Sequence, residues 1–286
     1  MVRAAYAVFS MAAAFWLAAF WPAAPAQAQT AVQQRAERTD ELFNWYYASI
    51  FGTGFYRIGE QQVAALRVPL RYELRPASAE RWGIRLTLPV TAAFAQFDLR
   101  DFNLGQVKTQ GLTVLPGIEL EIPLRQDWWL RPYANLGGGW EFHSGASSTI
   151  FSLGATTLHT RPLGEASRLA LGGKLGYAGY SAGSEASQLV QLSLGTEVAV
   201  PAGFAIAERA ALVVIQLTGS VYFKELEFLL PSTGTMQVSR ELELGVALGV
   251  QRPFEVLGVT FDRIGLAYRA GDNGLRGVRV VASFPF

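Results

Sequence analysis

Apolar and polar residues alternate along most of this chain with a period of two. The last stretch, RGVRVVASFPF at residues 276–286, shows the pattern clearly: Val278 and Val280 fall on one face, and Arg279 falls on the other. Successive side chains of a β-strand point to opposite faces, so this period predicts strands with one apolar face. Clusters of Gly, Pro, Asp and Asn between the segments predict turns.

Twelve segments share this alternation and predict twelve β-strands. They cover residues 44–55, 61–74, 81–97, 111–124, 128–142, 148–160, 167–180, 188–200, 210–223, 236–250, 259–269 and 275–286. In the segment 236–250, the outward face is predicted to hold Leu242, Leu244, Val246, Leu248 and Val250. The inward face is predicted to hold Ser239, Glu241, Glu243, Gly245 and Ala247.

The fold class predicted from this pattern is all-β, a transmembrane antiparallel up-and-down β-barrel of twelve strands. After the N-terminal segment no stretch offers the roughly 20 consecutive apolar residues of a membrane helix, whereas a barrel spreads its apolar residues over alternate positions. Trp128 opens one strand and Trp140 closes it, a span of about 30 Å that fits two aromatic girdles. A soluble β-sandwich is the alternative.

The connections fall into two sets that place both chain ends on one side of the barrel. Turns are predicted on the inner side at residues 75–80, 125–127, 161–166, 201–205 and 252–257. Connections on the outer side are predicted at residues 98–110, 143–147, 181–186, 224–235 and 270–274.

The N-terminus has the features of a secretory signal peptide, residues 1–28. Arg3 supplies the positive charge, a long apolar core follows, and Ala26–Ala28 has the small-x-small form of a cleavage site. An uncleaved membrane anchor is the alternative. Residues 29–43 form an N-terminal segment, a short helix or a plug, before the barrel at 44–286. The spacing of apolar residues in 31–50 fits either a helix or a strand.

Composition and charge narrow the chemistry. The chain has a formal charge of +1 and no cysteine, so we expect no binding to nucleic acid, no disulfide and no thiol nucleophile. No metal-binding cluster or phosphate-binding loop stands out in the sequence, and we expect no cofactor.

Charged residues recur on the predicted inward faces. We expect them to pair across neighbouring strands and to keep the lumen closed or narrow; in an open pore they would instead tune ion selectivity. Arg67, Arg71 and Arg85 should reach Glu119 and Glu121 in this way. The full set is Arg67, Arg71, Glu73, Arg85, Glu119, Glu121, Arg131, Lys174, Glu197, Glu241, Glu243, Arg263 and Arg279.

An enzyme is the rival class. A lipid-modifying barrel of the phospholipase or lipid A deacylase type would need a base beside a nucleophile, and His143 and Ser144 are adjacent near an outer loop. Neighbouring residues of a strand point to opposite faces, and the other histidine, His159, belongs to the inner side. We therefore expect no enzymatic activity.

The C-terminal strand resembles the assembly signal of bacterial outer-membrane proteins, an amphipathic strand that ends in Phe. The matching residues are Val278, Val280, Ala282, Phe284 and Phe286. The resemblance implies recognition by the barrel-assembly machinery and contact with outer-membrane lipid and lipopolysaccharide. The apolar side of this strand, the terminal Phe included, is expected to face lipid.

The segments GTGFYRIGEQQVAALRVPLRYELR, WGIRLTLPVT, VLPGIELEIPL and WWLRPYANLGGGWEF resemble the solitary autotransporter-type barrels. These are similar to an autotransporter translocator domain without a passenger, and the similarity covers most of residues 50–286. It implies an outer-membrane barrel, expected to be a monomer, with a structural or narrow-pore role. The short stretch between the cleavage site and the first strand leaves no room for a passenger.

Overall fold

The computed structural model describes residues 51–59, 61–95, 109–142, 145–164, 166–183, 185–230, 234–256 and 259–286, all within the unit Glu41–Phe286. The predicted signal peptide and the segment 29–43 lie outside these residues. No helix within the described ranges is long and apolar enough to cross a membrane.

The described residues form one antiparallel sheet of long, two-faced strands. The strands are β1 (Gly54–Ile58), β2 (Gln61–Arg75), β3 (Gly83–Ala95), β4 (Thr109–Val114), β5 (Gly117–Arg125), β6 (Trp128–Glu141), β7 (Ser147–Leu163), β8 (Ser167–Ala182), β9 (Glu185–Ile206), β10 (Arg209–Leu230), β11 (Gly234–Val256), β12 (Val259–Gly271) and β13 (Arg276–Val281), with a short 3-10 helix, η2 (Asp272–Gly274), before the last strand.

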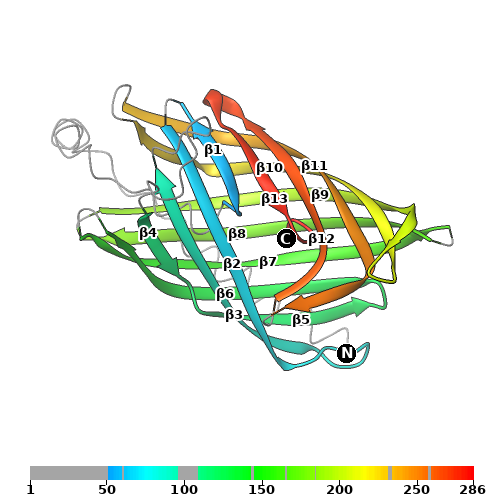
Figure 1. Cartoon of the computed structure of the whole chain (residues 1–286). Helices are drawn as coiled ribbons and strands as arrows, with labels where there is room; N and C mark the ends of the chain where they lie inside the picture. The colour runs from blue at the N-terminus through cyan, green and yellow to red at the C-terminus, as the bar shows by residue number, and fades with distance from the viewer. Residues whose placement is uncertain are drawn as a thin grey trace. The chain divides into compact units, whose positions relative to one another are not determined.

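The sheet closes on itself because the first strand pairs with the last. Gly54 of β1 lies opposite Ala65 of β2 on one side and opposite Arg279 of β13 on the other. The N–H of Val280 also donates to the carbonyl oxygen of Thr53 at 2.8 Å. Figure 1 shows β1 and β13 side by side in the wall of the barrel. Closure removes the unpaired edges that an open sheet exposes.

Strands β4 and β5 share one position in the wall, between β3 and β6. Pro116 interrupts them, since proline has no N–H to donate to a neighbouring strand. Pairing continues across the break: the N–H of Leu115 donates to Pro89 and the N–H of Leu136 donates to Pro116, both at 3.0 Å. The thirteen described strands therefore occupy twelve wall positions, which confirms the predicted twelve-strand barrel.

The two faces of the wall differ as the alternation predicts. On β11, Leu242, Leu244 and Val246 are 55%, 54% and 54% exposed on the outside. Glu241 and Glu243, which alternate with them along the chain, are 9% and 3% exposed and face the lumen. Val250 departs from the predicted outward set because it is buried; it lies where the register between β11 and β12 shifts.

Alternate connections lie at opposite ends of the barrel. We call the end with the β1–β2, β3–β4, β6–β7, β8–β9, β10–β11 and β12–β13 connections rim A, and the other end rim B. Exposed Trp140 and Phe142 belong to rim A, and exposed Tyr72, Trp82 and Trp128 belong to rim B. Trp128 and Trp140 thus lie at opposite ends, as the predicted girdles require, whereas Tyr222 near rim A is buried in the lumen.

Two turns were predicted too early because strands run past them. Residues 201–205 belong to β9, and the β9–β10 hairpin turns at Ala207 and Glu208, which have φ of 47° and 64°. Gly203 has a φ of 79° and lies where the register of this hairpin shifts. It therefore forms a β-bulge within the strand instead of a turn. Residues 252–256 likewise belong to β11, and β10 continues to Leu230 instead of ending at 223.

The two strands that close the barrel are shorter than predicted. The first was predicted over 44–55, but β1 covers Gly54–Ile58; residues 44–50 lie outside the described ranges. The last was predicted to reach Phe286, but β13 ends at Val281. Because β1 begins at Gly54, it contains no residues that could pair with those after Val281.

Candidate functional site: the lumen of the barrel

An apolar septum fills the lumen near rim A. We use this name for the contiguous buried cluster of Phe51, Tyr56, Ile58, Val63, Ala65, Ala178, Leu189, Tyr222, Val238 and Leu275. Phe51 and Tyr56 pack with ring centroids 4.3 Å apart. In the order of the sheet, β8 stands six positions from β1 in a ring of twelve. The septum therefore joins opposite walls, and the sequence pattern did not reveal it.

A first ion-pair cluster lines the wall formed by β3, β5 and β6. Arg85 Nη1 donates to Glu119 Oε1 at 2.8 Å, and Arg85 Nη2 donates to Glu121 Oε2 at 2.6 Å. Arg131 Nη2 lies 2.7 Å from Glu121 Oε1. Glu73 is more loosely placed, 3.6 Å from Arg85. Arg85 and Glu119 occupy the same register position on neighbouring strands, so their side chains meet directly.

A second cluster holds the strands beside the closure together. Glu243 of β11 accepts hydrogen bonds from Arg269 of β12, 3.0 Å from Nη2, and from Arg279 of β13. Glu241 lies 3.5 Å from Arg269 Nη1. All four side chains are largely buried, and a charge removed from water in this way is costly unless it is paired. These bonds link β11, β12 and β13 inside the barrel.

A third cluster centres on Glu197 of β9. Arg263 of β12 binds Glu197 from across the lumen and also binds its chain neighbour Asp262 at 2.6 Å. Arg168 of β8 lies 3.5 Å from the same glutamate. Glu197 is 1% exposed, so the two arginines supply the positive charge that its burial demands.

The structure places ten of the thirteen predicted lumen charges in these clusters. Arg67, Arg71 and Lys174 are the other three, and no ion pair of theirs is found among the described residues. The expectation that Arg67 and Arg71 pair with Glu119 and Glu121 is therefore wrong: Arg85 and Arg131 hold both carboxylates instead.

Three cluster members were missed in the sequence. Arg269 has the same parity as Arg263, and Arg168 has the same parity as Lys174, so continued alternation to the strand ends would have found both. Asp262 could not be found this way, because it neighbours Arg263 and alternation assigns it to the opposite face. It reaches the guanidinium group where the β11–β12 register shifts.

The C-terminal residues leave the wall and enter the lumen. A Cβ built on Gly172 of β8 would lie 2.5 Å from the Phe284 ring, and one built on Gly195 of β9 would lie 3.2 Å from the Phe286 ring. The two rings pack with centroids 5.5 Å apart. Figure 1 marks the C-terminus partway along the barrel. The expectation that Phe284 and Phe286 face lipid is therefore wrong, while Val278 and Val280 are exposed outside.

Of the two histidines, His159 lies among the described residues. His143 and Ser144 lie outside the described residues. His159 Nδ1 lies 3.6 Å from Asp127 Oδ2, and its ring packs against Trp128 with centroids 6.0 Å apart. This Asp–His contact was not foreseen. It lies at rim B, as predicted for His159, because Asp127 belongs to the β5–β6 turn.

Comparisons with known proteins show a similarity in fold to solved structures. No family model matches the chain, and no curated protein matches it. Among solved structures, the chain is similar to the beta domain of the Bordetella autotransporter BrkA, with 14% sequence identity and a TM-score of 0.49, covering 79% of this chain and 95% of that one. Identity at this level assigns no function, which therefore has to be inferred from the barrel itself.

Proposed function

We propose that this chain is a bacterial outer-membrane barrel with a structural or narrow-pore role and a lumen that is closed at rest. The observation that carries the proposal is the contrast across one wall: apolar side chains cover the outside of a closed hydrogen-bonded cylinder, while charges and amides face inward. Lipid offers no partner to backbone polar groups, and a closed barrel leaves none unpaired at an edge.

In this proposal rim A faces the cell exterior and rim B faces the periplasm, with signal-peptide cleavage near Ala28. Lipid and lipopolysaccharide contact the apolar outside, and the barrel acts as a monomer. The outward residues of β13, Val278 and Val280, are the part of the C-terminal signal that an assembly machinery can contact from the membrane. Because Phe284 and Phe286 end in the lumen, they would have to enter it after recognition.

The first test is the membrane itself. The full chain, expressed in a Gram-negative host, should fractionate with the outer membrane and migrate differently on a gel before and after boiling. The long, closed hydrogen-bond network of a barrel resists detergent until it is heated. Recovery as a soluble periplasmic protein would contradict the proposal.

The second test is the lumen. In planar bilayers the wild-type barrel should show little steady conductance, because the septum and the ion-paired clusters occupy its interior. A large and steady current would show an ordinary open pore. The proposed role is non-enzymatic; release of lipid products by wild type but not by a His143→Ala/Ser144→Ala variant would support the lipid-modifying alternative instead.

A further inference from the structure

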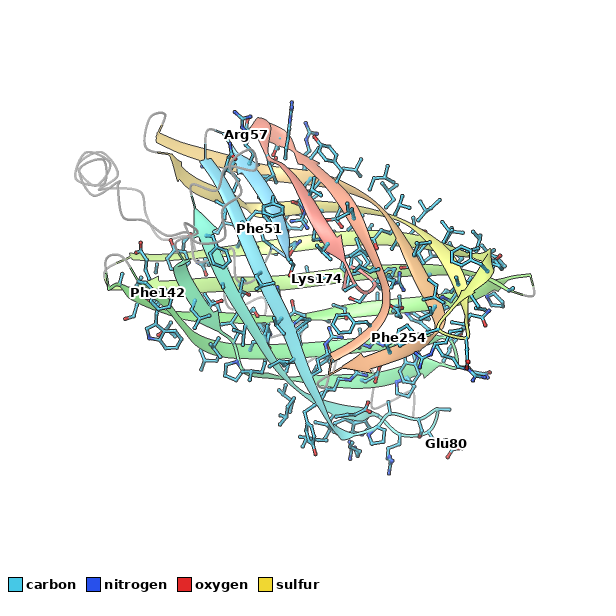
Figure 2. The ribbon with its side chains drawn as sticks, viewed as in Figure 1. Phe51, Arg57, Glu80, Phe142, Lys174 and Phe254 are labelled. Carbon is cyan, nitrogen blue, oxygen red and sulfur yellow. The ribbon has the colours of Figure 1, made fainter. Side chains whose placement is uncertain are left out.

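The lumen holds a chamber that both polar and apolar side chains line. Its volume is about 300 Å³, and the septum residue Leu189 and the C-terminal residues Phe284 and Phe286 are among those that line it. Its polar lining combines the cations Arg67, Arg71 and Lys174 with hydroxyl and amide groups of Tyr133, Asn135, Gln191 and Ser193. Figure 2 places Lys174 within the length of the barrel, between Phe142 and Phe254.

The carboxylates around the chamber are already committed to other arginines. Glu119 accepts a hydrogen bond from Arg85 at 2.8 Å. Glu243 binds both Arg269 and Arg279, and Glu241 lies 3.5 Å from Arg269. Glu241 and Glu243 are thus matched by Arg269 and Arg279, whereas Glu119 shares Arg85 with Glu121 and Glu73 and also attracts Arg71 without forming an ion pair with it.

Arg67, Arg71 and Lys174 lack such a partner. In the part of the chain that the structure describes, no carboxylate of a side chain lies within 4.0 Å of their charged groups. They come from nearly opposite walls, β2 and β8, and line the same chamber, where Arg67 repels both Arg71 and Lys174. Positive charges collected in a confined space attract anions and repel one another.

We propose that this chamber binds a small oxyanion, of which inorganic phosphate is the simplest example, between Arg67, Arg71 and Lys174. Arginine presents several N–H donors in a planar fork that matches an oxyanion, and lysine adds a point charge. The nearby hydroxyl and amide groups supply further hydrogen bonds. The proposal goes beyond a structural or narrow-pore role and rests on lumen contacts alone, so it does not depend on any conductance.

Besides the three glutamates of its lining, the chamber has a further competing anion among the described residues. Phe286 lines the same chamber, and its α-carboxylate is the last group of the chain. No ion pair of this terminus is found among the described residues. An experiment must therefore separate a free oxyanion from the terminal carboxylate.

The test is phosphate binding to the full-length barrel, refolded in a neutral detergent without phospholipid, so that lipid headgroups are absent. Binding is followed by equilibrium dialysis at low ionic strength, because salt screens the attraction. Wild type should bind one phosphate per barrel. Arg67→Gln and Lys174→Gln should each weaken binding about tenfold or more, the size expected for losing a hydrogen bond to a charged group.

Arg57→Gln is the matched control. Arg57 is exposed beside the β1–β2 turn, where it donates to the carbonyl oxygen of Gly59 at 3.2 Å, and its removal changes the net charge equally. This variant should bind phosphate as wild type does. Heat modifiability on a gel verifies that each variant is folded.

A second measurement distinguishes a binding site from a structural one. Without phosphate, Arg67→Gln and Lys174→Gln should unfold at higher denaturant than wild type, because each relieves repulsion between unpaired charges. With phosphate, wild type and Arg57→Gln should gain more stability than Arg67→Gln and Lys174→Gln, since a ligand that binds the native state stabilises it. A side chain that merely supports the wall would instead destabilise the empty barrel when replaced.

These experiments have outcomes that would overturn the proposed oxyanion site and outcomes that would support it. Absence of phosphate binding by wild type, or an equal loss in Arg57→Gln, would overturn the proposal. Binding that emerges only when the terminal carboxylate is amidated would overturn it too, and would show that the chain's own terminus occupies the chamber. A barrel that binds phosphate yet conducts freely would support the site while contradicting the closed lumen.

Discussion

Arg85 of β3 and Glu121 of β5 form a direct lumenal ion pair in which Arg85 Nη2 donates to Glu121 Oε2 at 2.6 Å. Arg131 shares the same carboxylate from β6 on the other side. A single glutamate thus links three neighbouring wall positions through the interior, in addition to the backbone pairing. Inward charges in this barrel therefore act as cross-links of the wall.

Replacing Glu121 by Gln should destabilise the folded barrel by on the order of 1–3 kcal/mol, because it leaves two poorly solvated arginines without their shared charge. Denaturant unfolding followed by tryptophan fluorescence measures the change. Glu73→Gln is the control: Glu73 lies 3.6 Å from Arg85, and its side chain is 50% exposed, so its loss should cost far less. Equal effects of the two substitutions would contradict the cross-linking role of Glu121.

Replacing Phe51 by Ala should open the septum. Phe51 is fully buried against Tyr56, and removal of a buried aromatic ring costs about 3–5 kcal/mol where the cavity cannot collapse. In planar bilayers this variant should conduct more than wild type. Phe55→Ala removes a ring that is 38% exposed and lies on β1, and it should leave the conductance unchanged. An unaltered current in both variants would place the barrier elsewhere in the lumen.

Alternation along the chain was enough to predict the wall and much of its lining. Leu242 and Glu243 were assigned to opposite faces, and the strand order placed Arg85 beside Glu119, because pairing register follows from the two-residue period. Alternation describes only chain that remains in the wall. It could not show that Phe51 and Phe286 leave the wall for the lumen, since a side chain that enters from a strand end obeys no period.

Turn chemistry explains another part of the difference between the predicted and the observed strands. Two-residue hairpin turns usually contain Gly or Asn, but this turn consists of Ala207 and Glu208, both with positive φ. Pro201 and Gly203, which do suggest a turn, lie within β9. The long β9–β10 pairing holds the chain in this unfavourable turn. That pairing is a property of the assembled barrel and not of the local sequence.

That turn predicts a stabilising change. Ala207→Asn/Glu208→Gly would place at both positions residues that tolerate positive φ, and should stabilise the barrel by about 1 kcal/mol or more. Gly203→Ala is the converse test. The φ of Gly203 is 79° and nothing lies within 4 Å of a new Cβ, so any loss of stability comes from backbone strain alone. Denaturant midpoints in one detergent compare the three proteins; a double variant no more stable than wild type would contradict the proposed strain.

The lumenal position of the C-terminus can be tested because the chain has no cysteine, so a single introduced thiol is the only one to react. In the folded barrel, Phe286→Cys should react slowly with a bulky maleimide, whereas Arg57→Cys at the exposed rim should react quickly. Adding Gly172→Ala should accelerate the reaction of Phe286→Cys, because the new methyl group would lie 2.5 Å from the Phe284 ring and displace the terminal segment. Gly219→Ala, whose new methyl group has its nearest neighbour at 3.9 Å, should have no such effect. Rapid labelling of Phe286→Cys in the absence of either glycine change would show that the terminus does not rest in the lumen.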